Sequence, residues 1–169
     1  FDDQGSRFDA EGNLENWWTE EDRARFEERT KRLIEQYNAL TPRDLEGEEP
    51  PLHVNGALTL GENIGDLAGL SIAWQAYVSR LKEKGETPQT APAIDGLTAA
   101  QRFFTSWARG WRTAIRREFA KQLLSIDPHS PAEFRCNQVV ANMDSFAEAY
   151  DLAPDDALWI APNERVRIW

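Results

Sequence analysis

Two carboxylates in the stretch 59–66, Glu62 and Asp66, have the spacing of groups that act together on one helix. Side chains four residues apart project from the same helical face. Their like charges repel, and the surrounding leucine and isoleucine residues favour burial of this face, so each acid needs a partner. We expect that partner to be a cation, a lysine or arginine, or a histidine that donates to Asp66. A simpler interpretation also fits, because Thr59 and Glu62 have the spacing of a capping box and acids are favoured in a first helical turn.

The segment Asp127-Pro128-His129-Ser130-Pro131 and the nearby Arg135 hold the other polar groups of interest. The residue before each proline is pushed out of helical geometry, so this segment is predicted to break the chain sharply. From residue type alone, His129 fits a turn histidine that bonds to backbone as well as a histidine with a role in a site. Arg135 likewise fits an ordinary surface ion pair as well as a ligand-binding group.

Apolar residues recur at helical spacing in four segments of the chain. These segments are residues 20–39, 60–84, 98–126 and 143–151. Thr19 is the expected N-cap of the first helix, and Thr98 with Gln101 has the spacing of a capping box for the third. The other regular pieces are expected to be short: one helical turn after Pro131, an extended piece at Val139–Val140 and a strand-like end at 165–169. The fold class is therefore predicted to be mainly α, with long loops and little β.

Composition narrows the possible functions. The 169 residues correspond to about one domain, and the charge of −10, from 19 Lys+Arg against 29 Asp+Glu, disfavours binding to nucleic acid. No apolar run approaches the roughly 20 residues of a membrane-spanning helix. Cys136 is the only cysteine, and His53 and His129 are the only histidines, so the sequence excludes an internal disulfide and a metal site built from several imidazoles of this chain.

Four stretches of the sequence, in order, resemble the neprilysin-like family of zinc metalloendopeptidases. They are Phe1–Gly5 with Phe8-Asp9 and Gly12–Thr19, His53–Asp66, Asp127–Pro131 with Phe134-Arg135, and Pro162–Trp169. The resemblance covers essentially the whole chain. It implies that residues 1–169 are the C-terminal portion of one thermolysin-like or neprilysin-like catalytic domain.

The resemblance implies a role for four side chains in zinc-dependent hydrolysis of peptide bonds. Glu62 would be the third protein ligand of one zinc ion. Asp66 would orient a zinc-binding histidine or serve as a proton donor. His129 would donate a hydrogen bond to the oxyanion of the tetrahedral intermediate, and Arg135 would hold a carbonyl of the substrate.

The chain contains no HExxH motif, which in this family supplies two zinc ligands and the general base. The expected partners are therefore an upstream segment that bears HExxH and peptide substrates, and the chain alone is predicted to be inactive. The alternative is a non-catalytic interaction module that associates through the apolar surface left by the missing segment. The single cysteine is compatible with a bacterial-type relative, secreted or periplasmic, and the sequence leaves the compartment open.

Overall fold

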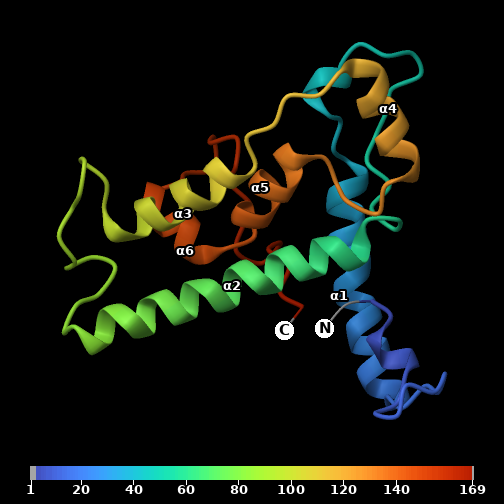
Figure 1. The fold of residues 1–169 in the computed structure, drawn as a ribbon, viewed down its shortest axis with the longest axis horizontal. Helices are drawn as coiled ribbons and strands as arrows, with labels where there is room; N and C mark the ends of the chain where they lie inside the picture. The colour runs from blue at the N-terminus through green and yellow to red at the C-terminus, as the bar shows by residue number, and fades with distance from the viewer. Residues whose placement is uncertain (1–2, 169) are drawn as a thin grey trace. The chain divides into compact units, whose positions relative to one another are not determined.

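The computed structural model describes residues 3–168, over which the chain is mainly helical (Figure 1). Phe1, Asp2 and Trp169, at the ends of the first and last family-like stretches, lie outside the described residues. The helices are α1 Glu20–Asn38, α2 Leu60–Glu83, α3 Ala99–Gly110, α4 Arg117–Ile126, α5 Ala132–Ala141 and α6 Asp144–Tyr150, with 3-10 helices η1 Gly5–Arg7 and η2 Arg43–Leu45. Extended pairing in this part of the chain is limited to two isolated bridges, Phe8 with Leu14 and Ile94 with Leu97. The predicted fold class is confirmed, and no helix within residues 3–168 combines the length and apolar character needed to cross a membrane.

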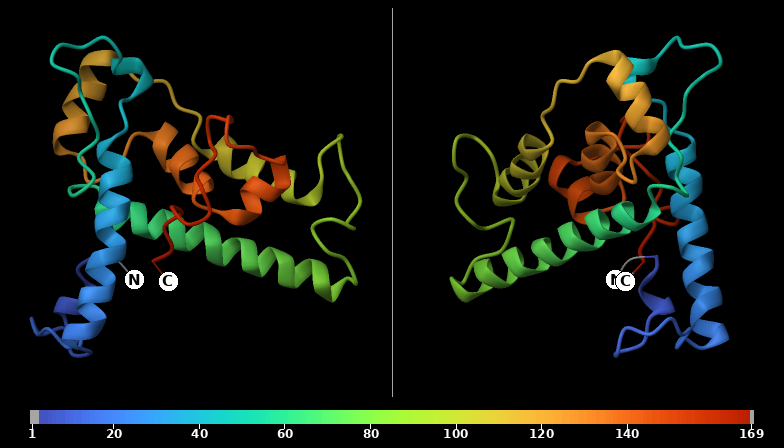
Figure 2. Two further views of the ribbon diagram at one scale, coloured as in Figure 1. Left: turned by 180° about the vertical axis from the view of Figure 1, so that it is seen from behind. Right: turned by 45° about the vertical axis from the view of Figure 1, so that its right-hand side comes forward.

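The chain divides into two compact units. The first comprises residues up to 65, residues 114–131 and residues from 166 onward, and the second comprises residues 66–113 and 132–165. Helix α2 is uninterrupted in both further views, so it begins in the first unit and continues into the second (Figure 2).

The first unit is built on α1 and the loop that follows it. Thr19 caps α1 as predicted, since its side chain accepts the backbone N–H of Asp22. The apolar face of α1 is buried, and Tyr37 is only 1% exposed. The loop after α1 comes back to lie directly against that helix at Gly56, whose backbone N–H donates to Asn38 Oδ1 at 2.8 Å. This close approach requires glycine, because a Cβ at position 56 would lie 2.4 Å from the backbone carbonyl oxygen of Ile34 in α1.

Helix α4, also in the first unit, is attached to the loop around η2 by charge. Arg117 and Lys121 both pair with Glu48, at 2.6 and 2.5 Å. Arg117 also donates to the backbone carbonyls of Asp44 and Glu46. The hydrogen bond from Lys121, and then the one from Arg117, lowers the pKa of the Glu48 carboxyl below its ordinary value.

The predicted single helix over residues 98–126 is wrong. Helix α3 begins with the predicted capping box between Thr98 and Gln101, but it ends at Gly110, and α4 begins only at Arg117. Glycine is unfavourable inside a helix, and β-branched residues follow it in the break, which weakens the helix there. The contacts of Arg117 with Glu48, 69 residues away in the sequence, then fix α4 as a separate element.

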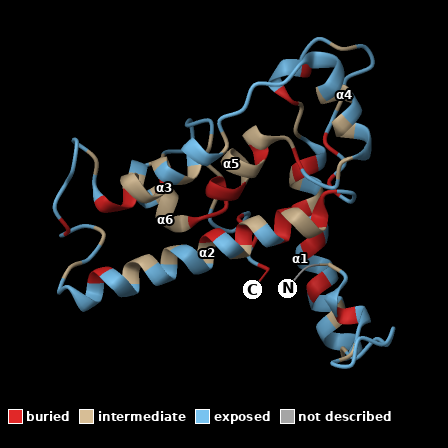
Figure 3. Ribbon diagram, in the orientation of Figure 1, coloured by how far each residue is buried: buried red, intermediate tan, exposed pale blue. Residues whose placement is uncertain are grey.

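In the second unit α3, α5 and α6 pack together, and aromatic side chains of this unit contact one another (Figure 3). Trp74 of α2 stacks on Phe104 of α3 with ring centroids 5.2 Å apart, and Phe146 of α6 meets the same ring edge-on at 5.3 Å. Phe104 is 2% exposed. Arg165 donates to Asp144 at 2.7 Å, which holds the chain after α6 against the start of that helix.

Four predictions concern the C-terminal part of the chain, from residue 132 onward. Residues 132–141 form a full helix rather than one turn, and the extended piece predicted at Val139–Val140 is wrong. Both valines are buried in α5, at 1% and 3% exposure, because packing of an apolar helical face outweighs the weak strand preference of valine. Residues 165–168 form no strand, so that prediction is also wrong, whereas the helix predicted at 143–151 is confirmed as α6.

Candidate functional site

The first turn of α2 is fixed by a buried polar cluster in the first unit. The Thr59 hydroxyl donates to the backbone carbonyl of Asn55 at 3.1 Å and accepts from Asn63 Nδ2 at 2.9 Å. Ser130 Oγ, from the loop after α4, donates to Asn63 Oδ1 at 2.8 Å. Thr59, Asn63 and Ser130 are each at most 3% exposed, so these hydrogen bonds are shielded from water.

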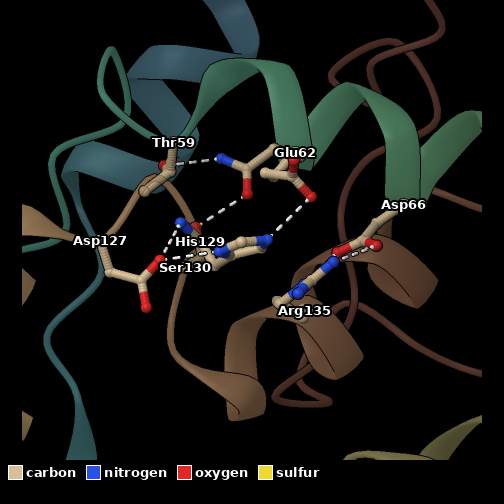
Figure 4. Close-up of polar contacts among 8 residues, drawn as sticks. Thr59, Glu62, Asp66, Asp127, His129, Ser130 and Arg135 are labelled. Carbon is tan, nitrogen blue, oxygen red and sulfur yellow. Dashed lines mark hydrogen bonds and ion pairs between the residues drawn. The ribbon is translucent and has the colours of Figure 1, made fainter. Parts of the chain in front are cut away.

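Glu62 and His129 face each other beside this cluster (Figure 4). His129 Nε2 lies 3.2 Å from Glu62 Oε2, and His129 Nδ1 lies 2.7 Å from Asp127 Oδ1. The same Asp127 oxygen accepts the backbone N–H of His129 at 2.9 Å. The side chains of Glu62 and His129 are 45% and 44% exposed, so a ligand can approach both. Each ring nitrogen therefore has a carboxylate oxygen as a partner, which fixes the plane of the imidazole.

Asp66 lies one turn further along α2 and belongs to the second unit, where Arg135 is its partner (Figure 4). Arg135 Nε and Nη2 donate to the two Asp66 carboxylate oxygens at 2.6 and 2.8 Å. The side chain of Asp66 is only 11% exposed and that of Arg135 is 19% exposed. The guanidinium also lies 4.4 Å from the centre of the Trp111 ring, which is within the range of a cation–π contact. Arg135 is therefore held from two sides and is not an ordinary surface residue.

The four predicted site residues thus form two pairs, Glu62 with His129 and Asp66 with Arg135. The expectation that an acid on this face needs a partner is confirmed for Asp66. Of the partners considered from the sequence, a cation, a lysine or arginine, or a histidine, the structure shows an arginine, Arg135. The expectation that both acids turn inward is wrong for Glu62. Glu62 lies at the edge of the buried stripe of α2, so its longer side chain reaches solvent. These contacts do not by themselves test the catalytic roles, which stay predictions.

Three residues that contribute to the site have no individual role predicted from the sequence: Asp127, Asn63 and Ser130. Asp127 could have been found, because an aspartate often bonds to the backbone N–H two residues later, as it does here with His129. Nothing local indicates the Asn63–Ser130 contact, whose members are 67 residues apart in the sequence.

Within residues 3–168, no group of three or more His, Cys, Asp or Glu side chains could hold a metal ion. A half-exposed carboxylate such as Glu62 fits a zinc ligand in its chemistry and its accessibility. The described residues therefore fit a contribution to a zinc site and not a complete one.

The fold is that of solved zinc metalloproteases. A zinc metalloprotease of Mycobacterium tuberculosis in complex with an inhibitor matches all of this chain and 25% of its own length, with 57% sequence identity and a TM-score of 0.92. PepO of Lactobacillus rhamnosis matches all of this chain and 24% of its own length, with 32% identity and a TM-score of 0.80.

The protein-family model of peptidase family M13 matches residues 1–166 of this chain. The chain therefore belongs to peptidase family M13. Neprilysin-1 of Caenorhabditis elegans is 38% identical over 169 residues, and human neprilysin is 35% identical over the same length. The chain spans 22% of each of these relatives. The resemblance to neprilysin-like peptidases is confirmed.

Proposed function

We propose that the protein carrying this chain is a zinc-dependent endopeptidase that hydrolyses bonds in peptide substrates. In this proposal the chain supplies Glu62 as a zinc ligand and Asp66, His129 and Arg135 around the reacting peptide bond. The observation that carries it is the placement of a half-exposed carboxylate against an oriented imidazole, Glu62 with His129, at the start of α2. Membership of peptidase family M13 supports the same reaction class.

Zinc would be held by Glu62 together with ligands from a segment outside this chain, since the described residues offer no set of three. When bound, zinc supplies Lewis-acid polarisation of a carbonyl and a lowered pKa of its water. The partner in this arrangement is an upstream segment with an HExxH motif, as predicted from the sequence. Without that segment, we expect the chain to bind no zinc tightly and to cleave no peptide.

His129 would act as a hydrogen-bond donor to an oxygen that gains negative charge. A carboxylate only accepts, so Nδ1–H donates to Asp127, and Nε2 lies on the opposite side of the ring, toward Glu62. With Nδ1 protonated, Nε2 would donate in the imidazolium form, in which both ring nitrogens carry a proton. A donor that is oriented before the reaction needs no reorganisation as charge develops, which is the basis of oxyanion stabilisation.

Arg135 would hold a carbonyl of the substrate through directed N–H groups. The bidentate pairing with Asp66 and the contact with Trp111 fix the plane of the guanidinium. A carboxylate has about four lone-pair sites, so Asp66 retains acceptor capacity for a zinc-binding histidine of another segment while it pairs with Arg135.

The test compares two Glu→Gln substitutions on α2 in the intact protein that carries this chain. Glu62→Gln removes the proposed ligand, whereas Glu83→Gln changes an exposed acid of the last turn, paired with Arg80 and 63% exposed. Zinc content and cleavage of a fluorogenic peptide are measured for both variants. We expect Glu62→Gln to lose zinc and cleavage while Glu83→Gln keeps both. Stoichiometric zinc and unchanged cleavage in Glu62→Gln would contradict the proposal.

A second candidate is a non-catalytic interaction module, which is favoured by the exposed apolar residues of α4 and the segment before it. Ile115, Phe119 and Ile126 are 38%, 51% and 63% exposed. Gel filtration and zinc analysis, with and without the upstream segment, separate the two candidates. Stoichiometric zinc only in the pair favours the peptidase. A zinc-free oligomer that gains nothing from the upstream segment favours the module.

A further inference from the structure

We propose that Asn63 and Ser130 are positioning residues that hold His129 opposite Glu62. This inference rests on the proposed peptidase function, because it assigns a task to residues beside the proposed site. All four residues belong to the first unit, so the argument needs only contacts within that unit.

Two adjacent contacts join the same two segments of chain. Glu62 and His129 form the outer contact, with side chains 45% and 44% exposed. Their direct neighbours in the sequence, Asn63 and Ser130, form the inner contact, with residues 1% and 3% exposed. The outer contact is exposed to solvent and contributes little to holding the loop. The inner contact is shielded from water, and its loss would leave a buried polar atom without a partner.

The inner contact is the start of a chain of hydrogen bonds that runs in one direction. Ser130 donates to Asn63 Oδ1, Asn63 Nδ2 donates to Thr59 Oγ1, and the Thr59 hydroxyl donates to the Asn55 carbonyl. An asparagine side chain suits position 63 because one planar amide both accepts from Ser130 and donates to Thr59. An aspartate could not donate, and a leucine of similar size could do neither.

Two prolines limit the backbone hydrogen bonds of the loop that carries His129. Pro128 and Pro131 flank the histidine and serine and have no backbone N–H to donate. The backbone N–H of His129 is satisfied inside the loop, by Asp127. Ser130 therefore provides a side-chain anchor next to His129, onto a helical turn that carries Glu62 on the adjacent residue.

The experiment uses the intact protein that carries this chain, with variants Asn63→Leu, Ser130→Ala and their combination. The matched control is Asn142→Leu. Asn142 is buried like Asn63, at 3% exposure, and the substitution removes a side-chain hydrogen bond to the Gln138 carbonyl at 2.8 Å. Zinc content, kcat, KM and hydrogen–deuterium exchange of residues 127–135 are measured. A purely structural role would change Asn63→Leu and Asn142→Leu alike.

We expect Ser130→Ala and Asn63→Leu to lower kcat at least about tenfold with little change in KM or zinc content, because small misplacement of a reacting group is costly. Exchange in residues 127–135 should rise in both variants, and the combination should lose no more than the worse single variant. Asn142→Leu should leave kcat and this exchange unchanged. An active zinc-dependent peptidase whose kcat and exchange are unaffected by Ser130→Ala would overturn the inference. A parent protein without zinc-dependent cleavage would instead overturn the proposed function, and exchange would still test the contact.

Discussion

Replacing Arg135 with alanine should destabilise the protein strongly, because it leaves the Asp66 carboxylate without its bidentate partner. Both carboxylate oxygens accept from the guanidinium, at 2.6 and 2.8 Å, and the Asp66 side chain is only 11% exposed. Removing one partner of a fully buried pair costs about 3–5 kcal/mol, and the cost for this part-buried pair is expected to be below that range. The lost contact with the Trp111 ring adds about 1 kcal/mol.

The matched control is Arg80→Ala in the same helix as Asp66. Arg80 pairs with Glu83 at 2.5 Å, but the two side chains are 70% and 63% exposed. An exposed pair of this kind contributes about 0–1 kcal/mol, so burial is the feature that distinguishes the two variants. The combination Asp66→Leu with Arg135→Met removes both part-buried charges and should recover much of the stability lost in Arg135→Ala.

The assay is denaturant-induced unfolding of the intact protein, monitored by tryptophan fluorescence, with the midpoint and slope compared among the variants. We expect a large decrease in the midpoint for Arg135→Ala, a small one for Arg80→Ala, and partial recovery for the double variant. Equal midpoints for Arg135→Ala and Arg80→Ala would refute the view that the Asp66–Arg135 pair is a buried structural element.

Three further predictions follow from local geometry and charge. Gly56→Ala should cost about 1–3 kcal/mol in thermal unfolding through a clash with the backbone of α1, whereas Gly69→Ala, which meets no atom within 4 Å, should stabilise α2 by about 0.5–1 kcal/mol. The pKa of Glu48 is lowered from its ordinary value of 4.5, chiefly by the hydrogen bond from Lys121. The stability that ionised Glu48 contributes is therefore present above that pH and should be lost as the pH falls through the lowered pKa. In an acid titration monitored by unfolding, Glu48→Gln should lose less stability than the wild-type protein. Burial raises the pKa of the Cys136 thiol, so a thiol reagent should modify it more slowly than free cysteine, and equally fast labelling would contradict this.

Helices with local signals were predictable from the sequence. Thr19 accepts the backbone N–H of Asp22 at the start of α1, and Thr98 forms the expected capping box with Gln101 at the start of α3. Each signal lies within a few residues of the element it determines, so the sequence pattern is sufficient.

The features that were not predictable depend on residues far apart in the chain. The separation of α4 from α3 involves Arg117 and Glu48, and the loop with His129 is attached through Ser130 and Asn63. The exposure of Glu62 also depends on packing, because the apolar residues around it indicate a buried face and only the structure shows that it lies at the edge of that face. Spacing predicted that Asp66 needs a partner, but the identity of Arg135 depends on the fold.

The most direct test of the central claim is the distance between Glu62 and the metal in a zinc-loaded crystal of the intact protein, with the metal located by anomalous scattering. The proposed function predicts one Glu62 carboxylate oxygen at about 2.0–2.2 Å from zinc. A zinc ion held by other residues, with Glu62 still paired only with His129 as in the present structure, would contradict it.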